Sequence, residues 1–104
     1  MPDAYQLKIL TPAWRDLDRI SDLHLLLVGP QSAEKITDKL LDTLELLASQ
    51  PWMGALHPDP FLAQYEYRKV ICGNYICIYK VIETDIYVYR ILDGRTDYPK
   101  LLKE

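Results

Sequence analysis

The dipeptide Gly73-Asn74 limits the fold of this chain more than any other feature of its sequence. It separates two runs that are rich in β-branched and aromatic residues, 64–71 and 75–82. A two-residue loop of this kind joins the strands of a β-hairpin. Thr84-Asp85 marks a second turn, and residues 86–92 form the next alternating run. The last third of the chain is therefore predicted to be an antiparallel meander of three strands.

The first half of the chain predicts one strand followed by two helices. Residues 5–10 alternate between apolar and polar side chains, as in a half-buried strand. A helix then begins at Thr11-Pro12, with Thr11 expected as the N-cap and Asp16 near the positive end of the helix dipole. Gly29-Pro30 ends this helix, and a second apolar stripe runs through residues 31–49. Because the link is short, the two helices are expected to form an antiparallel hairpin.

This order of elements predicts an α+β fold, β-α-α-β-β-β, with an antiparallel sheet and the helical hairpin packed on one of its faces. A chain of 104 residues is expected to form a single domain over residues 1–104. The proline-rich residues 51–60 are expected to form a loop without regular structure. The N-terminus lacks a basic patch followed by an apolar run, and the run 25–28 is too short to span a membrane, so we expect a cytoplasmic protein.

The charge of the chain and its two cysteines narrow the classes of function. The net charge is −3, from five basic and nine acidic residues in 1–59 and seven basic and six acidic residues in 60–104. Nucleic-acid binders usually carry a strong basic excess, so tight non-specific binding is not expected, although a local basic patch stays open. Cys72 and Cys77 have no second pair of ligands at metal-binding spacing. We therefore expect free thiols, no metal and no cofactor.

The hairpin turn decides which side chains share a face of the sheet, because side chains alternate along a strand. It pairs residues 68, 70 and 72 with residues 79, 77 and 75. The first face is then predicted to hold Glu66, Arg68, Val70, Tyr75, Cys77, Tyr79, Val81, Ile86, Val88, Arg90 and Leu92. The second face is predicted to hold Tyr65, Tyr67, Lys69, Ile71, Ile76, Ile78, Lys80, Tyr87, Tyr89 and Ile91.

Neither face is plainly polar, although an antiparallel sheet normally buries one face and wets the other. Tyrosine and lysine carry apolar bodies with polar tips, which suit a surface that binds a partner, so the second face is the candidate open face. The alternative is that tyrosines are simply good strand formers. The candidate binding residues are Tyr65, Tyr67, Lys69, Lys80, Tyr87, Tyr89 and Arg90.

Three further side chains have two interpretations each. Arg68 and Arg90 can clamp a phosphate through two N–H groups, or they can form structural ion pairs with Glu66 or Asp85. His57, in the proline-rich loop, can act as a base, but we expect it to be a solvated loop residue.

A series of short motifs follows in order along nearly the whole chain. They are Tyr5-Gln6-Leu7-Lys8-Ile9, Thr11-Pro12-Ala13 with Asp16-Leu17, Leu47-Ala48-Ser49-Gln50-Pro51, Arg68, Gly73-Asn74-Tyr75, Tyr79, and Arg90-Ile91-Leu92-Asp93-Gly94-Arg95-Thr96-Asp97-Tyr98. No single motif is specific, but in this order and spacing the chain resembles the RelE/ParE superfamily of bacterial toxins from type II toxin–antitoxin systems.

The resemblance implies a small toxin that is held inactive by an antitoxin wrapped around it. RelE-like members cleave mRNA in the ribosomal A site without a metal. ParE-like members bind and poison DNA gyrase and have no nuclease activity. The implied partners are therefore a cognate antitoxin and either the ribosome with its mRNA or DNA gyrase.

Two residues depart from the pattern of the mRNA-cleaving members. Those members carry an arginine directly after the tyrosine of the third strand, where this chain has Ile76, which cannot stabilise charge on a phosphate. Many carry a histidine in the closing motif, where this chain has Asp93, a poor acid at its usual pKa. If the chain is a nuclease, the candidate catalytic residues are Arg68, Arg95 and Tyr98, helped by Lys69 or Lys80.

The sequence thus predicts a growth-inhibiting toxin of this superfamily, with ribosome-bound mRNA or DNA gyrase as its target and its status as an enzyme open. The alternative is a non-toxic, decayed member that survives as a binding partner or co-repressor of an antitoxin.

Overall fold

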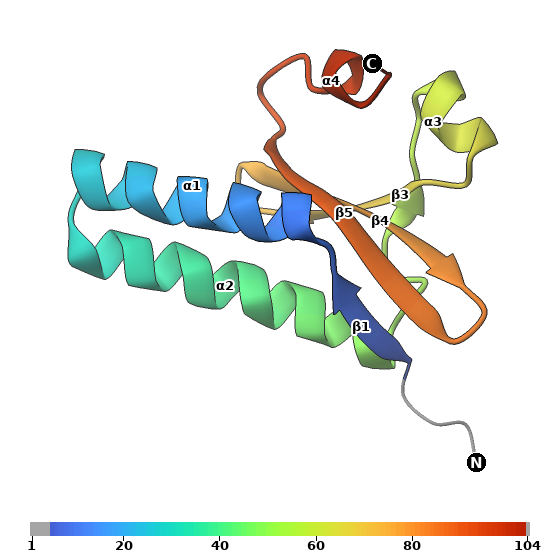
Figure 1. Cartoon of the computed structure of the whole chain (residues 1–104), viewed down its shortest axis with the longest axis horizontal. Helices are drawn as coiled ribbons and strands as arrows, with labels where there is room; N and C mark the ends of the chain where they lie inside the picture. The colour runs from blue at the N-terminus through green and yellow to red at the C-terminus, as the bar shows by residue number, and fades with distance from the viewer. Residues whose placement is uncertain (1–4, 104) are drawn as a thin grey trace.

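A computed structural model describes residues 5–103 of the chain (Figure 1). Its elements are β1 (Gln6–Ile9), α1 (Thr11–Leu27), α2 (Pro30–Ser49), β2 (Ala55–Leu56), α3 (Pro60–Gln64), β3 (Arg68–Cys72), β4 (Tyr75–Ile82), β5 (Asp85–Asp93) and α4 (Pro99–Lys103). The strands form one sheet in the order β1-β5-β4-β3-β2. The helices α1 and α2 lie side by side against one face of this sheet, and α3 and α4 lie on its other side (Figure 1). The predicted α+β fold with a helical hairpin on one face is confirmed.

The first strand makes the sheet mixed rather than wholly antiparallel. β1 pairs with β5 in parallel, from Gln6 opposite Asp85 to Ile9 opposite Val88. Parallel neighbours need a long connection between them, and here the helical hairpin is part of that connection. The meander of β3, β4 and β5 is antiparallel, as predicted. The alternation in residues 5–10 predicts a strand, but it says nothing about the direction of its neighbour.

The hairpin at Gly73-Asn74 has the predicted register, with residues 68, 70 and 72 opposite residues 79, 77 and 75. Gly73 has a φ of +60°, a conformation that favours glycine. The turn between β4 and β5 consists of Glu83 and Thr84, one residue earlier than predicted, and Glu83 has a φ of +56°.

Three further predicted boundaries are wrong. Thr11 is the first residue of α1, and the N-cap is Leu10, whose carbonyl accepts the first backbone hydrogen bonds of the helix. β3 begins only at Arg68, because residues 60–64 form the short helix α3. The loop 51–60 contains the two-residue strand β2, which pairs with β3. A proline-rich sequence gives no local signal for such a short strand, because its hydrogen bonds come from a neighbour in the tertiary structure.

A β-bulge interrupts the pairing of β4 with β5 at Tyr89. Ile78 lies opposite Arg90, and the next residue of β4, Tyr79, lies opposite Val88. Tyr89 is thus the extra residue of the bulged strand.

The bulge exchanges the predicted faces of Ile91 and Leu92. Ile91 lies opposite Cys77 and is buried on the first face, and Leu92 lies opposite Ile76 on the second face. The prediction is wrong for these two residues because one inserted residue reverses the alternation of the strand.

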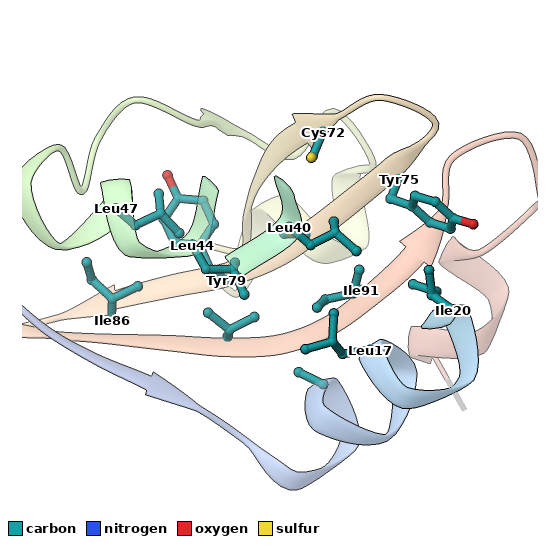
Figure 2. Packing of buried hydrophobic residues seen from close by; sticks show 13 residues of the cluster. Leu17, Ile20, Leu40, Leu44, Leu47, Cys72, Tyr75, Tyr79, Ile86 and Ile91 are labelled. Carbon is teal, nitrogen blue, oxygen red and sulfur yellow. The ribbon is translucent and has the colours of Figure 1, made fainter. Parts of the chain in front are cut away.

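The first face of the sheet forms the main core with the helical hairpin (Figure 2). Leu40, Leu44 and Leu47 of α2 are fully buried there, as their helical spacing predicts. From α1, Leu17 and Ile20 reach the same core. The sheet contributes Cys72, Tyr75, Cys77, Tyr79, Ile86, Val88 and Ile91. Because each buried leucine contributes about 1.5–3 kcal/mol relative to an exposed one, this stripe holds the hairpin on the sheet.

A second, smaller core lies on the opposite face and is closed by the end of the chain. Ile76, Ile78 and Leu92 are buried there with Tyr98, and Leu102 packs against them. The second face was expected to be open, and this is wrong for the half that residues 95–103, the C-terminal segment, cover. Alternation identifies the apolar side chains of a face, but it does not show that a distant segment returns to bury them.

Candidate functional site

Lys80 lies among three tyrosines on the uncovered half of the second face. Its Nζ atom is 4.2 Å from the ring centroid of Tyr67, 5.8 Å from that of Tyr89 and 5.9 Å from that of Tyr65. The rings of Tyr67 and Tyr89 meet edge to face, with their centroids 5.2 Å apart. We call these four residues the lysine–tyrosine surface.

The lysine–tyrosine surface combines residues that the predicted register assigns to one face. Lys80 comes from β4 and Tyr89 from the bulge of β5, whereas Tyr65 and Tyr67 precede β3. A lysine ammonium beside tyrosine rings is held by their quadrupoles, with about 0.5–1 kcal/mol at an exposed site. Tyr65 keeps 50% of its surface exposed. The cluster therefore presents aromatic faces and a cation to solvent together.

Tyr87 and Lys8 extend this surface toward β1. Tyr87 lies opposite Lys80 in the sheet, and the Lys8 Nζ atom is 5.5 Å from the Tyr87 ring centroid. Lys8 also forms a 3.2 Å ion pair with Asp85, and the hydrogen bond to this carboxylate raises the pKa of Lys8. Aromatic and cationic groups thus continue across β4, β5 and β1.

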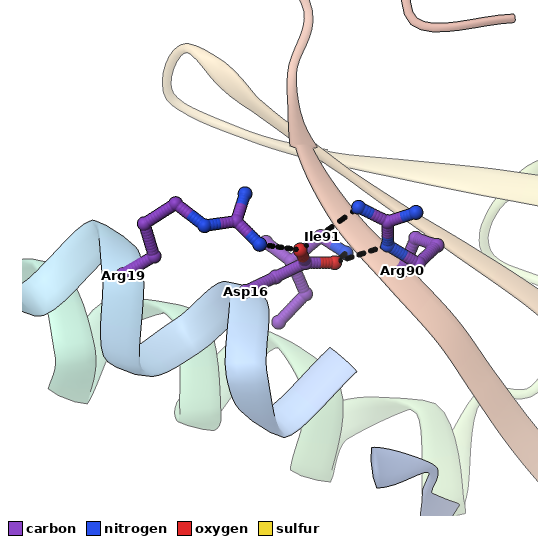
Figure 3. A network of polar contacts seen from close by, with 4 residues as sticks. All are labelled: Asp16, Arg19, Arg90 and Ile91. Carbon is purple, nitrogen blue, oxygen red and sulfur yellow. Dashed lines mark hydrogen bonds and ion pairs between the residues drawn. The ribbon is translucent and has the colours of Figure 1, made fainter. Parts of the chain in front are cut away.

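Arg90, also predicted to bind a partner, points instead toward α1 (Figure 3). Its Nε atom donates to Asp16 Oδ2 at 2.7 Å and its Nη2 atom to Asp16 Oδ1 at 3.0 Å. The hydrogen bond to Asp16 raises the pKa of Arg90. Arg90 therefore forms a structural ion pair, as the alternative interpretation expects. Its partner, however, is Asp16 and not Glu66 or Asp85.

Arg68 holds the loop that follows α2. Its Nε and Nη2 atoms donate to the backbone oxygen of Gly54 at 3.1 and 2.6 Å, and its guanidinium lies 5.0 Å from the ring centroid of Trp52. The Tyr79 hydroxyl supports the same loop, because it donates to the oxygen of Pro51 and accepts from the Gly54 N–H. A Cβ atom at Gly54 would lie 2.5 Å from the Tyr79 hydroxyl oxygen, so only glycine fits there.

Arg95 is engaged by Asp93. Its Nε and Nη2 atoms donate to the two carboxylate oxygens at 3.0 and 2.7 Å, and its backbone N–H donates to Asp93 Oδ1. The hydrogen bonds from Arg95 lower the pKa of Asp93 to about 2. At neutral pH this carboxylate therefore has no proton to give to a leaving group.

Tyr98 and His57 form a buried pair beneath the C-terminal segment. The Tyr98 hydroxyl lies 2.7 Å from His57 Nε2, and the Asp59 backbone N–H donates to His57 Nδ1 at 3.0 Å. Burial raises the pKa of Tyr98. Burial, followed by the charge of Lys69, lowers the pKa of His57. The prediction of a solvated His57 is wrong, because the loop folds back under Tyr98, and no sequence signal marks this contact.

The three candidate catalytic residues therefore have three separate sets of partners in the structure. Arg68 contacts the loop at Gly54, Arg95 contacts Asp93, and Tyr98 contacts His57. In residues 5–103, no three His, Cys, Asp or Glu side chains lie together as a metal ion would require. Cys72 and Cys77 are free and buried.

Residues 7–98 match the family described as the ParE toxin of the type II toxin-antitoxin system, parDE. This chain belongs to the ParE toxin family. A comparison with curated protein sequences found no match.

Two solved structures share the fold of this toxin. A chain of the chromosomal ParDE toxin–antitoxin system from P. aeruginosa has a TM-score of 0.73 and 22% identity, over 86% of the toxin and 96% of that chain. A chain of the RelBE2 toxin–antitoxin complex from Mycobacterium tuberculosis has a TM-score of 0.62 and 20% identity, over 86% of the toxin and 98% of that chain. At this level of identity the likeness shows the fold alone.

A cleft lies at the end of the toxin's helical hairpin where α1 connects to α2. One cavity there, of about 450 Å³, is lined by side chains that include Leu27, Ile36, Lys39 and Arg95. None of the described residues that line it carries a carboxylate. Beside the cleft, the apolar residues Leu25, Leu26, Leu27 and Val28 are exposed, Leu26 by 82%. No helix within residues 5–103 is long and apolar enough to cross a membrane.

Proposed function

We propose that this toxin inhibits growth in the cytoplasm by binding a macromolecular target, DNA gyrase, through the lysine–tyrosine surface. The observation that carries the proposal is the cluster of Lys80 with three tyrosine rings on the uncovered half of the second face. Aromatic side chains with polar tips are enriched in the centres of protein interfaces. Membership of the ParE family supports gyrase, because the resemblance of the sequence to ParE-like members implies that target.

The positions of the candidate catalytic residues favour binding over RNA cleavage. Cleavage of a phosphodiester needs a general acid and a group that stabilises charge on the phosphate. Asp93 is ionised at neutral pH, and Ile76 occupies a buried position in the second core. Tyr98 is buried and already hydrogen-bonded to His57. RNA cleavage would therefore need an acid and a cation that lie in separate parts of the structure.

A cognate antitoxin is the second proposed partner. The exposed leucines at the end of the hairpin suit an acidic segment with apolar side chains. The cleft beside them is lined by Lys39, and none of its lining residues within 5–103 carries a carboxylate. The two solved structures described above come from toxin–antitoxin systems. We therefore expect the protein encoded by the neighbouring gene to bind the toxin and to suppress its toxicity.

The test is induced expression in bacteria with pulse labelling of DNA and protein synthesis. We expect DNA synthesis to fall first, with translation initially intact. Lys80→Glu should relieve the inhibition, whereas the matched charge reversal Lys100→Glu, at an exposed site outside the surface, should not. In a supercoiling assay with purified gyrase, the wild-type toxin and Lys100→Glu should inhibit the enzyme, and Lys80→Glu should inhibit it less.

Three results would contradict parts of the proposal. An early fall in protein synthesis with mRNA fragments on ribosomes would assign the toxin to mRNA cleavage instead. Full toxicity of Lys80→Glu would exclude the lysine–tyrosine surface as the contact. Binding of the antitoxin without any effect on growth would identify a non-toxic partner or co-repressor.

A further inference from the structure

We propose that the His57–Tyr98 hydrogen bond is a proton-sensitive latch that holds the C-terminal segment closed over the buried half of the second face. The two residues are 41 positions apart in the sequence and 2.7 Å apart in the structure. Their contact joins the loop before α3 to the segment that precedes α4. This inference does not depend on the identity of the toxin's target.

The hydrogen bonds of His57 allow only one neutral form of its ring. The Asp59 backbone N–H donates to Nδ1 at 3.0 Å, so Nδ1 must be the unprotonated nitrogen. The ring proton of the neutral form is therefore on Nε2, where it is donated to the Tyr98 hydroxyl oxygen. A second proton can enter only at Nδ1, and there it would displace the Asp59 N–H.

The charged groups around His57 also oppose its protonation in the closed form. His57 is 3% exposed, and the nearby cations are Lys69 on β3 and Lys103 on α4. Asp59 is the carboxylate that faces it, but Asp59 is already paired with Lys103 at 2.8 Å. A buried imidazolium would thus lose a hydrogen bond and lie near two positive charges.

Few other contacts fasten this segment. Lys103 pairs with Asp59 and lies 5.9 Å from the ring centroid of Phe61, and Leu102 packs on the second core. α4 has only five residues. When the latch opens, Ile76, Ile78 and Leu92 lose the cover that Tyr98 provides.

The direction of the pH effect follows from linkage. Burial lowers the pKa of His57 in the closed form from its ordinary value of 6.5. The closed form is therefore fully favoured above pH 6.5, and its advantage falls as the pH drops from 6.5 through the lowered pKa. Acidification should open the segment, and alkaline conditions should not.

The test is amide hydrogen exchange of residues 96–103 in the purified full chain between pH 8 and 5, corrected for the intrinsic rate. We expect opening to increase by about threefold or more between pH 7 and 5 and to stay constant above pH 7. Amides of Cys77 and Val88, in the main core, should not change. Nitrogen NMR of the imidazole should show the Nε2–H form of His57 at pH 8.

Variants of His57 and His24 show which histidine causes the pH dependence. His57→Gln, whose side-chain NH₂ can still donate to Tyr98, should abolish the pH dependence, whereas His24→Gln should retain it. Loss of the response in His24→Gln instead would overturn the proposal. If His57→Gln does not fold, the wild-type titration still decides, because constant exchange while the His57 ring titrates would also overturn it.

Discussion

Asp16 on α1 and Arg90 on β5 are joined by two hydrogen bonds of 2.7 and 3.0 Å, although 74 positions separate them in the sequence. Asp16 is 1% exposed and also accepts from Arg19 and from the backbone N–H of Ile91 (Figure 3). Ile91 lies two residues after the bulge at Tyr89, where the β4–β5 ladder is interrupted. One carboxylate thus ties the helical hairpin to the sheet and accepts a backbone hydrogen bond from the bulged strand.

Asp16→Asn should destabilise the toxin by about 3 kcal/mol, because breaking a buried ion pair leaves the other charge uncompensated. We expect the lower end of the usual range, since the Arg90 side chain keeps 25% of its surface exposed. Urea denaturation of the purified protein would measure the loss. The exposed Asp18→Asn is the matched control and should change the free energy of unfolding by less than about 0.5 kcal/mol. Equal effects of the two variants would contradict the role of Asp16.

Tyr79→Phe should cost about 1–3 kcal/mol, because its hydroxyl bonds both Pro51 and Gly54 in a fully buried site. The variant leaves a buried carbonyl and a buried N–H without their partner. Tyr65→Phe removes a hydroxyl from a half-exposed ring and should leave stability nearly unchanged. Thermal denaturation of both variants tests this difference, which would be absent if the loop after α2 were free to move.

Asp93→Asn should remove part of the acid dependence of stability. The pKa of Asp93 is lowered from 3.8 to about 2 by Arg95, so the stability that this pair contributes is present above pH 3.8 and is lost as the pH falls through 2. Unfolding free energies measured from pH 5 to pH 2 should fall less steeply for the variant than for the wild type. Asp97→Asn is the control and should keep the pH dependence of the wild type. Identical pH profiles for Asp93→Asn and the wild type would refute the pairing of Asp93 with Arg95.

Tyr98→Phe should leave growth inhibition within about threefold of the wild type, because the proposed binding mode makes no chemical use of this hydroxyl. The measurement is the colony count after induction, with circular dichroism to confirm that the variant folds. A large loss of toxicity in a folded variant would favour catalysis by Tyr98 and hence the mRNA-cleaving activity.

Leu27→Asp should weaken antitoxin binding by about tenfold or more, because it places a carboxylate in an apolar patch that suits an acidic partner. Leu27 is 71% exposed, so the folding of the toxin should be little affected. Calorimetry with the protein encoded by the neighbouring gene would measure the change. Leu101→Asp, at another exposed leucine, is the control. Equal losses for both variants would move the antitoxin contact away from the hairpin end.

Local patterns predict much of this fold and part of the candidate site. The turn chemistry at Gly73-Asn74 determines the β3–β4 register, because a two-residue loop leaves no freedom to slip. The alternation that follows from this register brings Tyr67, Lys80 and Tyr89 to one face, where the structure shows them in contact. The helical spacing of Leu40, Leu44 and Leu47 likewise predicts the side of α2 that is buried. These features depend on residues that are close together in the sequence.

Contacts between distant segments have no local sequence signal and depend on how the whole chain packs. The bulge at Tyr89, the pairing of Asp16 with Arg90 and the burial of His57 under Tyr98 each need a partner from elsewhere in the chain. A charged or polar side chain gains a buried partner only after packing has excluded water, and no local spacing specifies which partner that is. Local sequence patterns were enough to predict the two long helices, the strand before them, the three-stranded meander, the hairpin register and the helical core face. Packing decided the direction of β1, the cover over the second face and the partners of Arg68 and Tyr98.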